Sequence, residues 1–196
     1  NRAIRRNMMH RVYWIGGSIF VVAGIIWLGI FISKKTTIVP PGQTQTYEDL
    51  GQQHITLQDV LPREYNSNPP SSGGHYASPA NWGIYDYEVN DRIFIHNLEH
   101  GGIWIAYKPS VPAEVVAELK AIADGFGGLK IIMAPRSAND ADVAVAAWKH
   151  VYKFNLARHD GGLTDQQKTD IKNFYKALRD RGPEDVPSFM DGVDPK

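Results

Sequence analysis

The segment from Arg92 to Tyr107 reads RIFIHNLEHGGIWIAY, and the prediction of the fold begins from it. Two runs rich in β-branched and aromatic residues, 92–96 and 103–107, stand on either side of a polar stretch that ends in two glycines. Runs of this length and composition are typical of β-strands, and a glycine pair between them is typical of a turn. The pattern therefore predicts an antiparallel hairpin.

Two helices are predicted downstream of this hairpin. A helix over 112–124 has a proline in its first turn and an apolar stripe along one face, and a glycine-rich segment follows it. A second helix over 164–181 begins with Thr164 and has Gln167 three residues later, which is the spacing of a capping box. Both helices have one apolar face, so we expect both to pack on the sheet.

Further strands are predicted over 130–134 and 143–154, where short apolar or alternating runs occur. With the hairpin and the helices they predict the fold class α+β: a small, mostly antiparallel sheet with two packed helices. Residues 47–196 are long enough to form one such domain around one core.

The N-terminal part has a different composition. Residues 12–32 contain no charged side chain, and about 20 apolar residues cross a ~30 Å hydrocarbon layer as a helix. The segment 1–11 before this run is rich in arginine, whereas only Lys34 and Lys35 follow closely. The positive-inside rule then predicts a single-pass anchor with residues 1–11 in the cytoplasm. A cleaved signal peptide would have a shorter apolar core.

Small residues recur on one side of this predicted membrane helix: Gly16, Gly17, Ala23 and Gly24. Small residues let two helices approach closely in lipid, so we predict that this side binds a helix of a membrane-protein partner. The segment 33–46, rich in Pro, Gly, Thr and Gln, is expected to be an extended linker to the outer domain.

Composition excludes several kinds of function. The formal net charge is zero, and nucleic-acid binding usually needs a basic face, so we expect no nucleic-acid partner. The chain has no cysteine, which excludes disulfides, thiolate metal ligands and cysteine nucleophiles. It also contains no G-x-S-x-G, P-loop or G-x-G-x-x-G motif. We therefore expect a binding protein and not an enzyme.

Histidines concentrate around residues 96–102, which read HNLEHGG. His96, Glu99 and His100 match the inverted zincin pattern H-x-x-E-H. In that pattern one helix presents both histidines to a zinc ion, and the glutamate acts as a general base. The strand-like flanks and the glycine pair argue against a helix here, so a protease-like site is not expected.

A metal site built on loops is the second interpretation. In a straight strand the Cα atoms of His96 and His100 would lie about 13 Å apart, too far to share one ion, so the chain must bend between them. His75 and His54 are candidates for further ligands, and Met133 could add a thioether. A His/Met set favours copper and a His/carboxylate set favours zinc. A third interpretation is structural, with the histidines hydrogen-bonding carbonyl groups.

Several ordered motifs resemble a known family. They are YNSNPPSSGGHY at 65–76, WGIY at 82–85 and HNLEHGG at 96–102. Together they are similar to the bacterial domain-of-unknown-function family 3105, over about 54–148. The resemblance implies one N-terminal membrane helix and an outward domain, in the bacterial inner (cytoplasmic) membrane, with the domain periplasmic or extracellular. The family pattern includes residues that match His54, His75, His96 and His100, and it usually has a proline or small residue where Gly74 stands.

Two functions follow as expectations. The first is a non-enzymatic, membrane-anchored protein that binds copper or zinc through His96, His100 and His75, with His54 or Met133. The second is a structural accessory subunit of a larger respiratory or photosynthetic membrane complex. In that case the membrane helix and the outer face would contact the partner.

Overall fold

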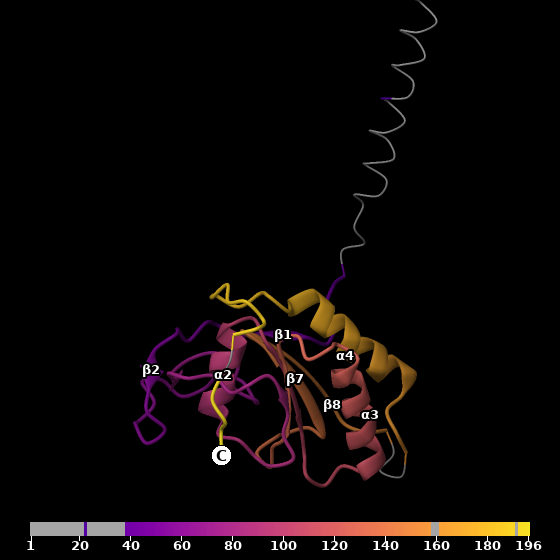
Figure 1. The fold of residues 1–196 in the computed structure, drawn as a ribbon. Helices are drawn as coiled ribbons and strands as arrows, with labels where there is room; N and C mark the ends of the chain where they lie inside the picture. The colour runs from indigo at the N-terminus through magenta and orange to yellow at the C-terminus, as the bar shows by residue number, and fades with distance from the viewer. Residues whose placement is uncertain (1–21, 23–37, 158–160, 191) are drawn as a thin grey trace, which may run out of the picture. The chain divides into compact units, whose positions relative to one another are not determined.

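The computed structural model describes residue 22 and residues 38–157, 161–190 and 192–196 (Figure 1). Residues 38–196 form one compact unit. The predicted membrane helix over 12–32, apart from Val22, and its four small residues lie outside the described residues. Within the described part of the chain, no helix has the length and apolar character needed to cross a membrane.

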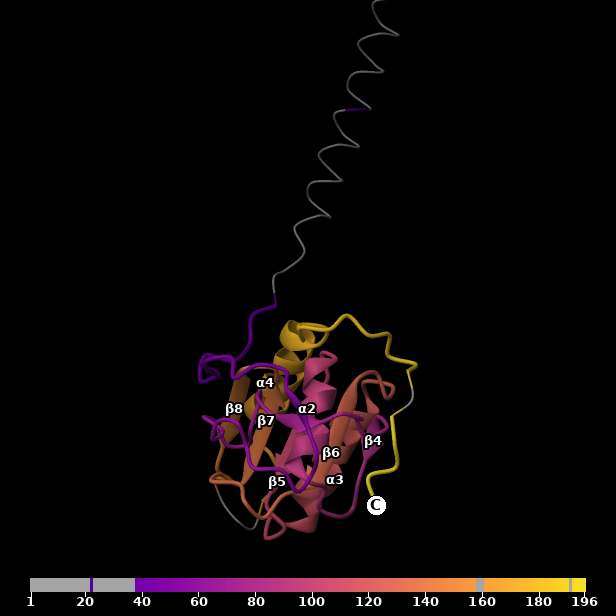
Figure 2. The same cartoon turned by 90° about the vertical axis from the view of Figure 1, so that its left-hand side faces the viewer.

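The centre of the domain is a six-stranded mixed sheet with the order β1-β8-β7-β5-β6-β4 (Figure 2). Neighbouring strands from β1 to β5 in this order are antiparallel, whereas β5, β6 and β4 are parallel neighbours. A separate pair of short parallel strands joins β2 to β3. The strands are β1 (Gln45–Thr46), β2 (His54–Ile55), β3 (His75–Tyr76), β4 (Gly83–Ile84), β5 (Ile103–Tyr107), β6 (Ile131–Pro135), β7 (Val143–Ala147) and β8 (His150–Phe154).

Helices cover both faces of the sheet (Figure 1). They are α2 (Asp91–Glu99), α3 (Ala113–Asp124) and α4 (Asp165–Leu178). Alternate residues of each strand point to opposite faces. On β5, Ile103 and Ile105 enter the core beneath α3 and α4, whereas Trp104 and Ala106 enter the core beneath α2. The sheet therefore separates two hydrophobic cores, and α2 belongs to the second of them.

The predicted hairpin over 92–107 is wrong in its first half. Residues 91–99 form the helix α2, and the Asn90 side chain caps it by accepting a hydrogen bond from the backbone N–H of Arg92 at 3.0 Å. Phe94 and Leu98 are four residues apart and both are buried against the sheet. Tertiary burial of this apolar face overrides the strand propensity of the Ile-Phe-Ile run. The strand β5 pairs with β6 and β7 instead.

The other predicted elements are confirmed with small changes of extent. The two downstream helices are α3 and α4, and the capping box at Thr164 is present. The predicted strand over 143–154 is a hairpin of β7 and β8. The sheet is larger than predicted, and it is mixed where a mostly antiparallel sheet was predicted. The strands β5 and β6 are parallel because α3 forms the crossover connection between them. The structure is α+β with three helices in its described part.

The sheet begins earlier in the chain than the predicted start of the domain. The last residues of the predicted linker form β1, which pairs with β8, so the sheet begins ahead of residue 47.

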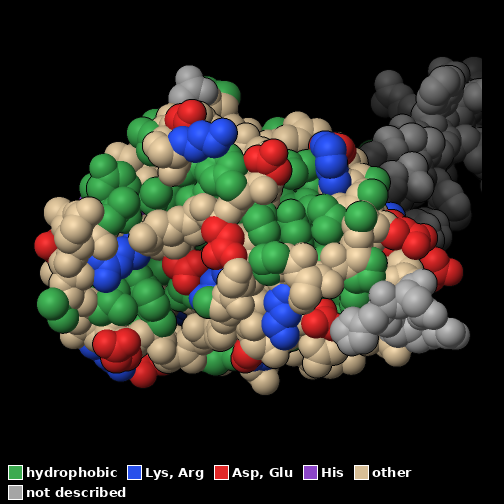
Figure 3. Space-filling model, turned by 90° about the horizontal axis from the view of Figure 1, so that it is seen from below, with side chains coloured by type: hydrophobic (Ala, Val, Ile, Leu, Met, Phe, Trp, Pro, Cys, Tyr) green, Lys and Arg blue, Asp and Glu red, His purple; other side chains and the backbone are tan. Residues whose placement is uncertain are grey.

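Figure 3 shows one face on which acidic and basic side chains are interspersed among apolar patches. This mixture of signs agrees with a net charge of zero.

Candidate metal centre

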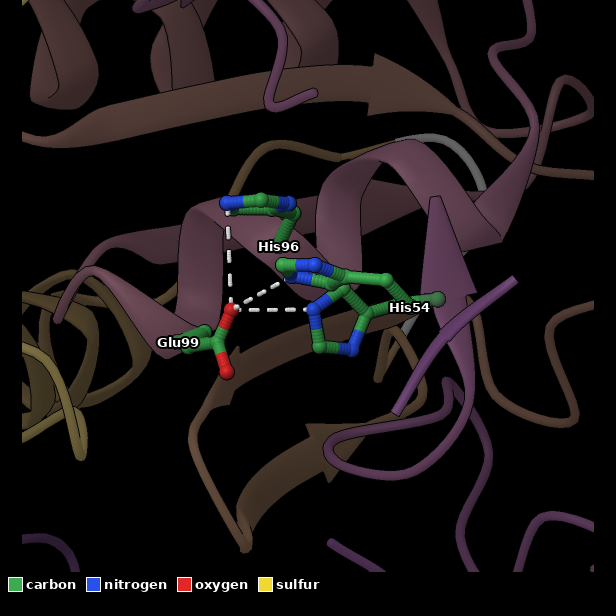
Figure 4. Close-up of side chains that lie close together, drawn as sticks. His54, His96 and Glu99 are labelled. Atoms are coloured by element: carbon green, nitrogen blue, oxygen red, sulfur yellow. Dashed lines mark hydrogen bonds and ion pairs between the residues drawn. The ribbon is translucent and has the colours of Figure 1, made fainter. Parts of the chain in front are cut away.

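Three segments far apart in the sequence bring four ionisable side chains to one place. The parallel pairing of β2 with β3 sets His54 directly opposite His75. The helix α2 supplies His96 and Glu99, which lie three residues apart and so share one helix face. Figure 4 shows His54 and His96 turned toward the carboxylate of Glu99.

We call the group of His54, His75, His96 and Glu99 the three-histidine cluster. The distances within it suit a single metal ion. Glu99 Oε2 is 2.9 Å from His75 Nε2, 3.6 Å from His54 Nε2 and 3.8 Å from His96 Nε2. One ligand atom from each of the four residues lies within 4.8 Å of all the others. Ligands about 2.0–2.1 Å from a tetrahedral zinc ion are about 3.3 Å from one another. Small side-chain shifts would therefore complete the coordination.

Two backbone carbonyl groups orient the rings. His75 Nδ1 donates to the carbonyl oxygen of Gly73 at 2.7 Å, and His96 Nδ1 donates to that of Tyr76 at 2.7 Å. A neutral imidazole that carries its proton on Nδ1 has its lone pair on Nε2. Metal-binding histidines commonly make such an N–H contact to a carbonyl or carboxylate on the side away from the ion. In both rings, then, the atom that faces the cluster is the one able to bind a cation.

Burial sets the charges in the cluster. The side chains of His75 and Glu99 are 0% and 1% exposed, whereas that of His54 is 47% exposed. Burial lowers the pKa of His96 to about 4, against the opposing effect of its hydrogen bond to Tyr76. Burial acts to raise the pKa of Glu99, but its close contacts with the imidazoles, chiefly that of His75, hold it below the usual value. At neutral pH the cluster thus offers a neutral imidazole and a carboxylate, as cation binding requires.

His100 lies at the edge of the three-histidine cluster. Its Nε2 is 3.0 Å from His96 Nε2 and 3.2 Å from Glu184 Oε2. His96 and His100 therefore meet, as a shared site requires, but the bend between them is a helical turn and not a loop. Burial lowers the pKa of His100, and the negative charges of Glu184 and Glu99 oppose this shift.

A family model matches residues 58–188, which is more than half of the chain, and its description is "Protein of unknown function (DUF3105)". This chain belongs to the DUF3105 family. The match confirms the resemblance seen in the sequence, and it covers His75, His96, Glu99 and Glu184, whereas His54 precedes it. Comparisons with curated proteins and with solved structures found no match.

The H-x-x-E-H pattern of this DUF3105 chain does lie on a helix, contrary to the argument from its flanking residues. His96 and Glu99 lie on α2, and His100 is the residue that ends it. Glu99, however, is not placed as in the protease-like arrangement. Its Oε2 contacts the Nε2 atoms of three imidazoles, and the shortest of these contacts is 2.9 Å, to His75. The carboxylate is thus one of four side chains whose ligand atoms lie close enough together that they could hold a metal ion.

The structure brings together four of the five predicted metal ligands of the DUF3105 chain. His54, His75 and His96 form the cluster, and His100 borders it. Met133 is buried in the core beneath α3 and α4, on the other face of the sheet from α2, and does not reach the histidines. The prediction of Met133 as a ligand followed from its donor type alone, since register along β6 decides which face its side chain enters.

Two carboxylates of the site were absent from the predicted ligand set. The sequence patterns predict Glu99 as a general base or as a turn cap and not as a ligand. Its position three residues after His96 places both side chains on one face only because the segment is helical. Glu184 carries no sequence signal. It reaches His100 because the segment after α4 folds back over the end of α2, where Glu184 N donates to the carbonyl oxygen of Glu99 at 3.1 Å.

Proposed function

We propose that this DUF3105 domain binds one first-row transition-metal ion through His54, His75, His96 and Glu99. The observation that carries this proposal is the set of three imidazole Nε2 atoms directed at one buried carboxylate oxygen, all within 3.8 Å. A buried carboxylate is costly unless cationic partners or hydrogen bonds compensate its charge. A divalent ion at the centre of the cluster would compensate it.

The structural interpretation of the histidines is less well supported. Histidines that serve only to hold loops together would satisfy carbonyl groups and leave no group of acceptor atoms facing one another. In this domain the Nδ1 atoms of His75 and His96 already serve that purpose. The remaining Nε2 atoms point inward, toward Glu99, which is the arrangement of ligands and their supporting contacts in metal sites.

Zinc is the metal that we propose in preference to copper. The four donors are three imidazole nitrogens and one carboxylate oxygen, and this His/carboxylate set favours zinc. A soft thioether would favour copper, but Met133 lies in the other core. We further propose a binding role and not a catalytic one, because Glu99 is engaged by the imidazoles.

Elemental analysis of the purified full-length chain tests the metal site. After dialysis against metal-free buffer, the wild-type chain is expected to retain about one equivalent of zinc, and His75→Ala less than about a tenth of an equivalent. His54 is half-exposed, so His54→Ala leaves the buried part of the cluster intact. This variant should weaken zinc binding at least about tenfold.

The matched control for these variants is His150→Gln. His150 is outside the cluster, on β8, where its Nδ1 contacts Thr46 Oγ1 at 3.0 Å, so this variant should keep the wild-type zinc content. Circular dichroism establishes that each variant is folded. A wild-type chain without zinc after loading, or equal zinc contents in all four proteins, would contradict the proposal.

We also propose that the domain is held outside the cytoplasm by the membrane span predicted over 12–32. Arginine-rich residues before this span and the absence of charge within it support the proposal. The chain has no cysteine, and Val60 is 90% exposed, so Val60→Cys introduces a single accessible thiol.

Labelling with a membrane-impermeant maleimide in intact spheroplasts tests this placement. Val60→Cys is expected to react before lysis, because residues after the span lie outside. Ala3→Cys, in the predicted cytoplasmic segment, should react only after the membrane is permeabilised. Labelling of Val60→Cys only after lysis would show that the domain faces the cytoplasm.

A further inference from the structure

We propose that Glu99, His100 and Glu184 hold a second divalent cation beside the first, with Glu99 shared between the two positions. This inference rests on the proposed function of the three-histidine cluster and extends it from one ion to two. One ligand atom from each of these three residues lies within 4.8 Å of the other two.

The geometry gives Glu99 an oxygen for each position. Its contacts with the imidazoles of His54, His75 and His96 all use Oε2. Figure 4 shows this oxygen turned toward the rings and the other turned away from them. A carboxylate can accept contacts on both oxygens, so Glu99 can bridge two cations, as carboxylates do in sites where two metal ions lie about 3.5–4 Å apart.

His100 is placed to bind the second ion rather than to stand free. Its Nε2 lies between His96 Nε2 at 3.0 Å and Glu184 Oε2 at 3.2 Å. Lys130, whose positive charge acts on His100, is engaged by Asp180, with 2.7 Å between Nζ and Oδ1. Its charge is therefore partly compensated and does not prevent a cation from binding to His100.

The position of Glu184 is built into the fold. Its backbone N–H donates to the carbonyl oxygen of Glu99, and that of Asp180 donates to Gly101 at 2.9 Å. A Cβ atom on Gly182 would clash with the carbonyl oxygen of Glu99 and with the backbone nitrogen of Gly101. Only glycine allows the chain to pass this close to the end of α2, and this close passage fixes Glu184 above His100.

The two positions differ in their ligands. The first has three imidazoles and the carboxylate of Glu99, whereas the second has one imidazole, the shared carboxylate of Glu99 and that of Glu184. Three protein ligands leave one or more coordination positions for water. The second position, with fewer imidazoles and more water ligands, should therefore bind zinc more weakly than the first.

Equilibrium dialysis of the metal-free, full-length chain against graded zinc concentrations tests the proposal. The wild-type chain is expected to bind about two equivalents, the second at least about tenfold more weakly than the first. Glu184→Gln should lose the weaker equivalent and keep the tighter one. Asp185→Asn removes the same charge from the neighbouring exposed residue and should keep both.

The outcomes separate this inference from the proposed function. One equivalent in the wild-type chain, unaffected by Glu184→Gln, would overturn the second position and leave the first intact. One equivalent that is weakened by His100→Ala would also overturn it, because His100 would then be a further ligand of a single ion. Binding of no zinc at all would overturn both proposals.

Discussion

Saturation of the metal-free chain with zinc is expected to raise its free energy of unfolding by about 4 kcal/mol when free zinc is about a thousand times the dissociation constant. The reason is that the ligands come from β2, β3 and α2, so only the folded chain holds them together. For a domain of this size about 1 kcal/mol corresponds to about 2–4 °C in melting temperature, and we expect a rise of roughly 8–16 °C.

Thermal unfolding with added zinc or with a chelator measures this effect. The zinc-dependent rise should disappear in His75→Ala, whose missing ring is the fully buried ligand. It should persist in His150→Gln, which removes an imidazole outside the cluster. The same rise in His75→Ala as in the wild-type chain would place the stabilising ion elsewhere in the molecule.

Phe94→Ala is expected to lower the free energy of unfolding by about 3–5 kcal/mol. Phe94 is fully buried on α2, and its ring centroid is 5.1 Å from that of Trp104 and 5.6 Å from that of Tyr85. The substitution leaves a cavity between α2 and the sheet. Because α2 also carries His96 and Glu99, loosening it should weaken zinc binding as well.

Phe189→Ala is the matched control for Phe94→Ala. Phe189 is 83% exposed, so the same chemical change should alter the free energy of unfolding by no more than about 0.5 kcal/mol. Urea unfolding of the metal-free proteins gives both values. Losses of similar size in the two variants would show that α2 does not form the second hydrophobic core.

Local sequence was sufficient to predict the elements whose boundaries carry their own signals. The helix α4 begins at a capping box made by Thr164 and Gln167, and α3 begins directly after Pro112, its N-cap residue. These are contacts between residues a few positions apart, so no knowledge of the rest of the fold is needed to place them. The strands β6, β7 and β8 were likewise visible as short apolar or alternating runs.

Local sequence failed at α2, where two preferences compete. Ile93, Phe94 and Ile95 favour a strand by composition, and the glycine pair after His100 favours a turn. The helix forms because its apolar face covers the side of the sheet that α3 and α4 leave free. That free face exists only once β5, β6 and β7 have assembled. The burial that decides in favour of a helix is therefore a tertiary interaction, which a short window of sequence does not contain.

The amino-acid sequence alone marked the chemistry of this protein: the family, the absence of thiols, and the histidines at 54, 75, 96 and 100. The tertiary structure decided which donors meet. It turned His96, Glu99 and His100 onto one helical turn, set His54 against His75 by strand pairing, and added Glu184 from the chain end. It also places Met133 in the core beneath α3 and α4, on the other face of the sheet from the histidines. Residue type determines what an atom can bind, but convergence of donors within a few ångströms depends on long-range packing and register.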